Sequence, residues 1–491
     1  MDIPESLKQF YDRLSVHNRR FLEYVDETPG GTEREVYEEL FKVSNELIVI
    51  QAWPIFINHA FRGEITEAAV KLFRLLKRIP FDVFKGDPAR IADYYGISPL
   101  RAAALISGVT QTHLDNLIGR ADCIMTPSGL KFVEFNVNTN LGGMEIETWL
   151  AAYQTVPLIR RFLERHEITL HNRKLLDLLF EFFADNLVER FGANAETLNI
   201  GVAVEKNEGK VHADSMEVYL DSVYNKALRN RHPHLKGQVR VGEFSRFSAA
   251  GDTVVCGDLP IHALVEMYVG YVPPDIYEVF KKGKILLYDG PISWLMSTKL
   301  SFALLSELEN DPVFSPDEQE TIRKHVPWTR KITDCQTTFK GENIQLLDFI
   351  LSNRERLVLK PPVGYGGTGI YVGHKTSDRE WREVVRTSLE HQGKNPALEP
   401  PGEPNQQDWD GFLKKTSYQD TWLVQECVFS YPFIFQSGED DYEPHDGAWG
   451  FFVFGDRYSG GWVRVLPTTN EKGVVNAHQG AQMSLILDVD E

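Results

Sequence analysis

The amino-acid sequence predicts a mixed α+β and α/β protein whose sheets follow a helical N-terminal region. Up to about residue 119, apolar residues recur at the spacing of amphipathic helices. Residues 120–138 predict two strands around a turn. Residues 198–288 alternate short apolar strands with helical stretches, a pattern typical of parallel sheets. At 491 residues the chain is long enough for roughly two to four domains.

The composition argues against several classes of partner. The formal net charge is −18, whereas broad nucleic-acid binding relies on Lys and Arg to neutralise phosphates. The four cysteines form no C-x-x-C pair, so neither a disulfide framework nor a zinc site is expected. The sequence shows no basic-then-apolar leader and no apolar run near the roughly 18 residues that span a bilayer. We therefore expect a cytoplasmic protein that binds neither nucleic acid nor membrane.

A glycine-rich segment carries the first chemical signal. The apolar run 357–359 predicts a short buried strand that ends at Lys360, and strand character returns at residues 370–372. The backbone N–H groups of a glycine-rich loop can approach a polyanion closely, and Lys360 adds a positive charge beside them. The segment predicts a nucleotide-phosphate site made by Lys360 with Gly364, Tyr365, Gly366, Gly367, Thr368 and Gly369.

The same glycines partly match two well-known nucleotide-binding patterns. Gly364, Gly366 and Gly369 satisfy the dinucleotide-binding pattern G-x-G-x-x-G, but that site requires a helix after the glycines. Here β-branched and aromatic residues follow, which favours the tip of a hairpin. The P-loop pattern G-x-x-x-x-G-K-[ST] is absent. A plain glycine-rich β-turn remains an alternative for the glycine cluster considered alone.

Residues 120–138 carry a second signal, a set of oxygen ligands. Glu134 and Asn136 are two apart on a strand and therefore project from one face, which Phe132 should share while Val133 points the other way. With Asp122 on the neighbouring strand they form a hard-oxygen set suited to Mg²⁺. The alternative is a solvated polar strand face.

The middle of the chain predicts a small α/β domain and a further cation. Its strands are expected at 198–204, 239–241, 253–255 and 285–288, and substrate binding is its natural role. Lys299 follows at the start of a helix, where a cation opposes the helix dipole unless it has an anionic partner. Lys299 is thus a candidate for a second phosphate contact, and the alternative is a solvated surface lysine.

The last part of the chain adds a strand, an insertion and a hairpin. Residues 393–408 are polar and proline-rich, which indicates a surface insertion. Residues 422–428 predict a strand in which Glu426 could hold ribose hydroxyls while backbone groups meet an adenine edge. Segments 448–455 and 461–465 predict a hairpin bearing Arg464, and Asn476 follows in a loop.

These motifs together resemble a known family. A strand with Lys360 and a glycine-rich loop, followed by Gln425-Glu426-Cys427-Val428, resembles the nucleotide half of an ATP-grasp ligase. In the usual order of that superfamily the E-x-N metal strand comes later, but here residues 134–136 precede the loop by more than 200 residues. The chain therefore resembles the circularly permuted ATP-grasp proteins related to glutathionylspermidine synthetase, over about residues 110–485.

The resemblance implies a role for each motif. ATP and Mg²⁺ would be the cofactors. Lys299 and Lys360 would grip the ATP phosphates with the glycine-rich loop over them, and Gln425, Glu426, Cys427 and Val428 would line the adenine and ribose pocket. Asp122, Glu134 and Asn136 would hold Mg²⁺. Arg120 would face the acyl phosphate, with Arg464 and Asn476 as further contacts near the transferred phosphate or the metal.

The resemblance also implies an ATP-grasp fold and a reaction. The expected parts are a helical region 1–115, a metal-binding part 116–165, a small α/β domain 166–295 and a nucleotide-binding part 296–491. The expected activity is that of an ATP-dependent carboxylate–amine ligase, which forms an amide through an acyl phosphate from small-molecule acid and amine substrates such as amino acids or small peptides. The alternatives are a phosphotransferase with the same nucleotide site and a non-catalytic nucleotide-binding protein.

Overall fold

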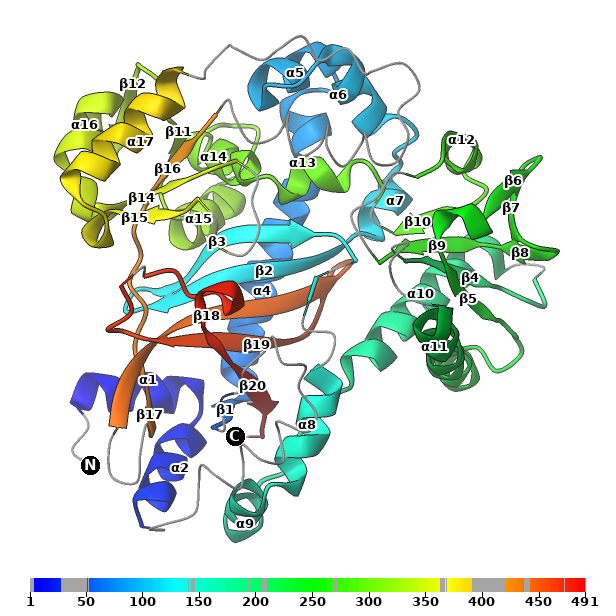
Figure 1. Ribbon diagram of the computed structural model, residues 1–491, viewed down its shortest axis with the longest axis horizontal. Coiled ribbons are helices and arrows are strands. Elements are labelled where there is room, and N and C mark those ends of the chain that lie inside the picture. Colours follow the sequence, from blue (N-terminus) through cyan, green and yellow to red (C-terminus); the bar gives the residue numbers. More distant parts are fainter. Residues whose placement is uncertain are drawn as a thin grey trace.

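The computed structural model describes residues 4–27, 51, 53–139, 141–142, 146–192, 195–204, 210–267, 272–288, 290–362, 367, 369–390, 421–436, 442–471 and 473–490. Within these residues the chain forms three principal β-sheets with helices around them (Figure 1). The glycine-rich loop residues 363–366 and 368, and the predicted insertion 393–408, lie outside the described residues. No helix in the described ranges is both long and apolar enough to cross a membrane.

The largest sheet lies at the centre of the view in Figure 1 and combines strands from the start, the first third and the end of the chain. Its order is β1-β20-β19-β18-β2-β3, with β17 paired to β18. β1 is parallel to β20, and the other pairings are antiparallel. The strands are β1 (Ile55–Ile57), β2 (Ile118–Thr126), β3 (Gly129–Val137), β17 (Phe433–Gln436), β18 (Tyr442–Phe454), β19 (Arg457–Pro467) and β20 (Gln482–Asp488).

Helix α4 (His59–Arg78) covers one face of this sheet (Figure 1). Its Phe73 stacks on Phe135 of β3 with ring centroids 5.2 Å apart, and its Phe61 meets Trp449 of β18 edge-on. Side chains alternate between the faces of a strand, so Glu134 and Asn136, which flank Phe135, project from the opposite face. The apolar face holds the sheet on α4, and the polar face is left for other contacts.

The predicted small α/β unit is present on the right of Figure 1. Its parallel sheet has the order β10-β9-β4-β5 and packs with α10, α11 and α12. One strand prediction needs correction: residues 253–255 form a strand, but it belongs to a separate antiparallel sheet, β6-β7-β8. β4 lies between two parallel neighbours, β5 and β9, and alternation of apolar runs did not reveal β9. The elements are α10 (Leu175–Phe191), β4 (Ile200–Ala203), α11 (Lys210–Arg231), β5 (Val239–Gly242), β6 (Ser248–Ala250), β7 (Thr253–Cys256), β8 (Leu259–Ile261), β9 (Ala263–Glu266), α12 (Pro274–Lys281) and β10 (Leu286–Tyr288).

A third sheet, antiparallel in the order β11-β16-β14-β15, lies at the upper left of Figure 1. The strand predicted at 357–359 is its β14 and ends at Lys360, as expected. Buried Trp328, Leu359, Trp381 and Val424 form its separate core. Its elements and those packed near it are α13 (Ser293–Ser297), α14 (Lys299–Glu307), α15 (Pro316–His325), β11 (Thr329–Lys331), β12 (Gln336–Phe339), β13 (Glu342–Gln345), α16 (Leu346–Ser352), β14 (Leu357–Lys360), β15 (Tyr371–Val372), α17 (Asp378–Glu390) and β16 (Leu423–Glu426).

The N-terminal helices tie the sheets together. The backbone N–H of Ile434 in β17 donates to the hydroxyl of Tyr11 at 2.8 Å, and the hydroxyls of Tyr95 and Ser301 in α14 are 2.9 Å apart. The helices share one hydrophobic core with the large sheet. The α-helices not yet named in the described part of the chain are α1 (Glu5–Leu14), α2 (Val16–Asp26), α5 (Pro88–Tyr95), α6 (Pro99–Ile106), α7 (Gln111–Asp115), α8 (Ile146–Thr155) and α9 (Pro157–Arg165), and a π-helical turn (Ile79–Val83) follows α4.

The third sheet depends on a tight approach at Gly373. A Cβ atom there would lie 1.8 Å from the carbonyl oxygen of Arg354 and 2.8 Å from that of Leu357. Since backbone atoms cannot move aside cheaply, we expect Gly373→Ala to lower the free energy of unfolding by about 3 kcal/mol, the upper part of the range for overpacking. Gly63 in α4 is the matched control, because a Cβ there meets nothing within 4 Å. Gly63→Ala should raise stability by about 0.5–1 kcal/mol. Urea denaturation of both variants tests this, and a Gly373→Ala protein as stable as the wild type would contradict it.

Candidate functional site

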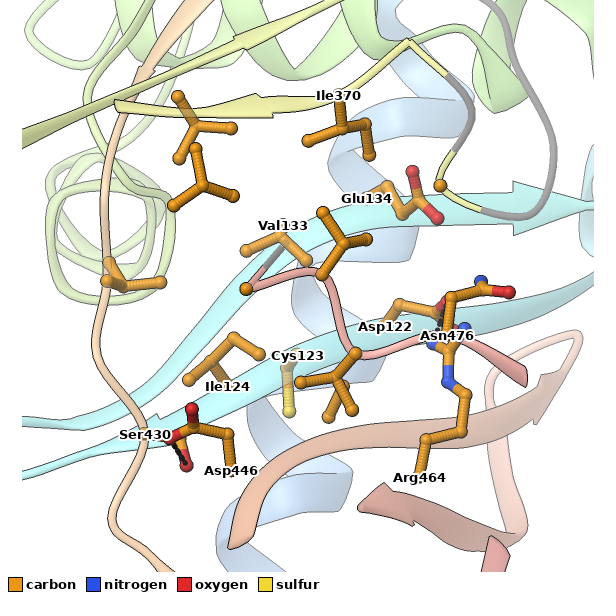
Figure 2. Close-up of a pocket in the computed structure, with 18 of the residues that line it drawn as sticks. Asp122, Cys123, Ile124, Val133, Glu134, Ile370, Ser430, Asp446, Arg464 and Asn476 are labelled. Carbon is orange, nitrogen blue, oxygen red and sulfur yellow. Dashed lines mark hydrogen bonds and ion pairs between the residues drawn. The ribbon is translucent and has the colours of Figure 1, made fainter. Parts of the chain in front are cut away.

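A cavity of about 650 Å³ lies between the polar face of the large sheet and the β14–β16 sheet (Figure 2). β2, β3, β18 and β19 form its floor, β14 and β15 form its roof, and the connection from β19 to β20 passes beside it. The predicted residues that line this cavity are Arg120, Asp122, Glu134, Asn136, Lys299, Lys360, Gly367, Gln425, Glu426, Cys427, Val428, Arg464 and Asn476. The cavity therefore brings the β2–β3 hairpin together with described residues of β14 and β16.

The glycine-rich loop is only partly described. Gly364, Tyr365, Gly366 and Thr368 lie outside the described residues, so their contacts remain predictions. Gly367 has a left-handed φ of 74°, and a Cβ there would lie 2.6 Å from Val474 in the β19–β20 connection. Gly369 also has a left-handed φ, of 73°, and packs beside Pro361 rather than in the cavity lining. Gly367 therefore lies against the connection that borders the cavity.

The β2–β3 hairpin aligns four of the predicted side chains. Arg120 pairs with Asn136 and Asp122 with Glu134 across the two strands, so all four project into the cavity. The predicted position of Phe132 on this face is wrong. The pairing shifts at a β-bulge between Asp122 and Cys123, which turns Val133 into the cavity and Phe132 into the core.

Two lysines and one carboxylate occupy the centre of the site. The ammonium of Lys299 lies 3.1 Å from the carboxylate of Glu134, and Lys360 donates to the amide oxygen of Gln425 at 2.6 Å. Burial alone would raise the pKa of Glu134, but the charges of Lys299 and Lys360 outweigh it and lower that pKa to about 2. Burial lowers the pKa of Lys360 to about 8, although Glu134 opposes the change. The site therefore holds two buried cations near one anion, an arrangement that favours a further anionic ligand.

The position of Lys299 follows from the start of α14. Thr298 is the N-cap of this helix and accepts a hydrogen bond from the backbone of Leu300. The backbone N–H of Lys299 and the hydroxyl of Thr298 both donate to the carbonyl oxygen of Pro362, at 3.0 and 3.2 Å. The anionic partner that the helix dipole required is Glu134. Helix α14 thus holds both a lysine of the site and the base of the glycine-rich loop.

A second charged group lies farther along the floor. Both oxygens of Asp122 accept hydrogen bonds from Arg120, at 2.7 and 3.1 Å, and one of them also accepts from Arg464 at 2.7 Å. Figure 2 shows Arg464 reaching from β19 to Asp122, close to Asn476. The guanidinium groups of Arg120 and Arg464 both lie over the ring of Trp462, at 5.2 and 4.9 Å from its centroid. Trp462 was not identified from the sequence, since a lone tryptophan in a strand carries no spacing signal.

Two asparagines have unsatisfied polar atoms. The Nδ2 atom of Asn136 and the Oδ1 atom of Asn138 are buried and have no hydrogen-bond partner among the described residues. Both side chains line the cavity. Within the described ranges no group of three or more His, Cys, Asp or Glu side chains is arranged to hold a metal ion. An oxygen-ligand site here would combine the carboxylate of Glu134 with asparagine oxygens, and Asn138 is a candidate that the sequence pattern did not single out.

The other end of the cavity is apolar. Val358, Ile370 and Val372 line the roof, and Ile124, Val133 and Ala448 line the floor. Figure 2 shows Asp446 and Ser430 at this end, and burial raises the pKa of Asp446. Sequence reasoning missed this slot, because ordinary apolar strand residues form it.

The strand predicted at residues 422–428, observed as β16, passes the apolar end of the cavity. The backbone N–H groups of Glu426 and Cys427 donate to Trp328 and Arg356, and the carboxylate of Glu426 pairs with Lys340 at 2.7 Å. A flat apolar ligand with an anionic tail would match the cavity, with its tail at the lysines.

Comparisons with known proteins bear on the fold. No protein-family model and no curated protein matches the sequence. The structure of a glutathione synthetase-like effector from Globodera pallida, in its apo form, is similar with a TM-score of 0.55 at 12% sequence identity, over 93% of this chain and 98% of that chain. A candidate gamma-glutamylcysteine synthetase from Methylobacillus flagellatus KT gives a TM-score of 0.39 at 10% identity, over 84% of this chain and 87% of that one. The chain therefore shares a mixed α/β fold with a glutathione synthetase-like protein.

The pKa of Lys360 predicts how stability depends on pH. Between about pH 8 and the ordinary lysine value of 10.5, the folded protein binds fewer protons at this site than the unfolded chain. Its contribution to the free energy of unfolding should therefore rise with pH, by up to about 1.4 kcal/mol per unit. Lys360→Met should remove this rise, which urea denaturation across about pH 8 to 10 measures. Lys284→Met, at an exposed lysine, is the control. Parallel pH profiles for the wild type and Lys360→Met would show that the lysine is not desolvated.

Proposed function

We propose that this protein is an ATP-dependent carboxylate–amine ligase of the circularly permuted ATP-grasp type. The observation that carries the proposal is the convergence of Lys299, Lys360 and Glu134 with Arg120 and Arg464 in one cavity that also has an apolar slot. The residues come from segments more than 300 positions apart, so their meeting is a property of the fold. The likeness in fold to a glutathione synthetase-like protein supports the same assignment.

The two ends of the cavity suit the two ends of ATP. The apolar slot between Val372 and Ile124 has the character of a purine site, and residues 425–428 border it. Lys299 and Lys360 would meet the triphosphate, with the glycine-rich loop supplying backbone N–H groups. When ATP binds, the carboxylate of Glu426 would release Lys340 and accept hydrogen bonds from the ribose hydroxyls.

The residues at the phosphate end fit Mg²⁺ as an oxygen-ligated ion. Glu134 and Asn136 were predicted as ligands, and the side-chain oxygen of Asn138, which has no partner within the described ranges, adds a third hard donor. Bound there, Mg²⁺ would neutralise phosphate charge and orient the transferred group. Asp122 was also predicted as a ligand, but its oxygens accept from two arginines in this structure.

The chemistry follows from the charges. A substrate carboxylate would attack the γ-phosphorus, giving an acyl phosphate and ADP, and an amine would then displace inorganic phosphate to form an amide. The lysines offset the repulsion between carboxylate and triphosphate in a site of low effective dielectric. Arg120 would stabilise the negative oxygen that develops when the amine attacks. Amino acids or small peptides are the substrate class we propose, in line with the glutathione synthetase-like neighbour.

Product analysis tests the proposal. Incubation with ATP, Mg²⁺ and pooled amino acids and polyamines should release ADP and phosphate and yield a new amide mass that requires both an acid and an amine. Lys360→Ala, Glu134→Ala and Arg120→Ala should fold but lose about 10²-fold or more in turnover, because each removes a charge that acts in the transition state. Lys284→Ala should retain wild-type turnover.

Different products would indicate different functions. A phosphorylated product formed without an amine would indicate a phosphotransferase. Nucleotide binding without any turnover would indicate a binding protein. Near wild-type turnover in Arg120→Ala would remove that residue from the chemistry while leaving the nucleotide site in place.

A further inference from the structure

Asp122 and Glu134 are cross-strand neighbours, yet they face different partners. The side chain of Asp122 is 3% exposed and its two oxygens accept three hydrogen bonds from Arg120 and Arg464. The side chain of Glu134 is 25% exposed, and its charged contact is Lys299 at 3.1 Å. A carboxylate offers about four lone-pair sites in all. Glu134 therefore keeps lone pairs available to a ligand in the cavity, whereas most lone pairs of Asp122 are already used.

Small residues on β18 make the arginine cluster possible. Gly450 pairs with Asp122 on one side and with Trp462 on the other, so it lies midway in one row across the three strands. A Cβ atom on Gly450 would lie 3.1 Å from Cδ of Arg120 and 3.3 Å from Cε2 of Trp462. The arginine and the indole therefore occupy the space that a side chain at position 450 would need. Ala448, the partner of Arg464 in the next row, is also small.

The two guanidinium groups are consequently held as one unit. Each lies over the ring of Trp462, which favours cations on its face, and each is bonded to the same carboxylate. Asp122 neutralises one of the two charges, so the unit retains one positive charge. Without the carboxylate, the two guanidinium groups would repel each other. The bridge therefore fixes their separation.

We infer that Asp122 is a positioning residue rather than a metal ligand, and that it joins Arg120 and Arg464 into a rigid pair that binds the oxygens of the transferred phosphoryl group. The metal ligands are then Glu134 and Asn136 of β3, with Asn138 just after the strand. This inference rests on the proposed function. It changes the role of Asp122 and assigns a shared role to Arg120 and Arg464.

The test separates metal affinity from phosphate affinity. Calorimetry of a non-hydrolysable ATP analogue at increasing Mg²⁺ gives the Mg²⁺ requirement, and calorimetry of inorganic phosphate with ADP and Mg²⁺ present probes the arginine pair. Glu134→Gln should raise the Mg²⁺ requirement about tenfold or more. Asp122→Asn should leave that requirement within about twofold of wild type. It should weaken phosphate binding about tenfold, because loss of the carboxylate bridge that positions the two guanidinium groups outweighs the unit of positive charge gained.

A second variant guards against misfolding of Asp122→Asn. Gly450→Ala leaves every carboxylate in place and displaces only Arg120 and Trp462 by a few tenths of an ångström. It should reproduce the pattern of unchanged Mg²⁺ requirement and weakened phosphate binding. Thermal melting verifies that each variant is folded.

The outcomes distinguish the inference from the function on which it rests. If Asp122→Asn raises the Mg²⁺ requirement as Glu134→Gln does, Asp122 is a metal ligand and the inference is overturned. It is also overturned if neither Asp122→Asn nor Gly450→Ala weakens phosphate binding. If the wild-type protein binds no ATP analogue at any Mg²⁺ concentration, the proposed function itself fails.

Discussion

The structure depends on holding two lysines, from α14 and β14, around one carboxylate of the large sheet. Lys299 and Lys360 are each less than a tenth exposed, and each would be costly to bury alone. Glu134 offsets part of that cost and ties the three elements to one point. The large sheet and the β14–β16 sheet therefore share an electrostatic contact at this point of the cavity.

Local sequence patterns were sufficient to predict the elements that carry these charges. Period-two alternation placed Glu134 and Asn136 on one face, and an apolar run ending at Lys360 gave β14. The α14 lysine was recognisable because its position conflicts with the helix dipole. These inferences succeeded because each depends on a few neighbouring residues, whose geometry the backbone fixes.

What the sequence could not show depends on contacts between distant strands. The bulge that turns Val133 into the cavity arises from pairing with β2, and no residue in the segment indicates it. β9 was not predicted because a short apolar run has no periodicity of its own. Asn138, Trp462 and Gly450 gain importance only from what lies across the sheet from them. The glycine-rich loop illustrates the reverse: its pattern is distinctive, while most of its residues lie outside the described part of the structure.

The pairing of β1 with β20 constrains how the molecule can be made. Strands from residues 55–57 and 118–137 complete their sheet only with strands from residues 442–488. On a ribosome, the early strands must therefore wait for their sheet partners until residues 442–488 have been synthesised. Such long-range pairing slows folding and exposes unpaired edges to aggregation. We expect the nascent chain to be a client for chaperones until the last strands arrive.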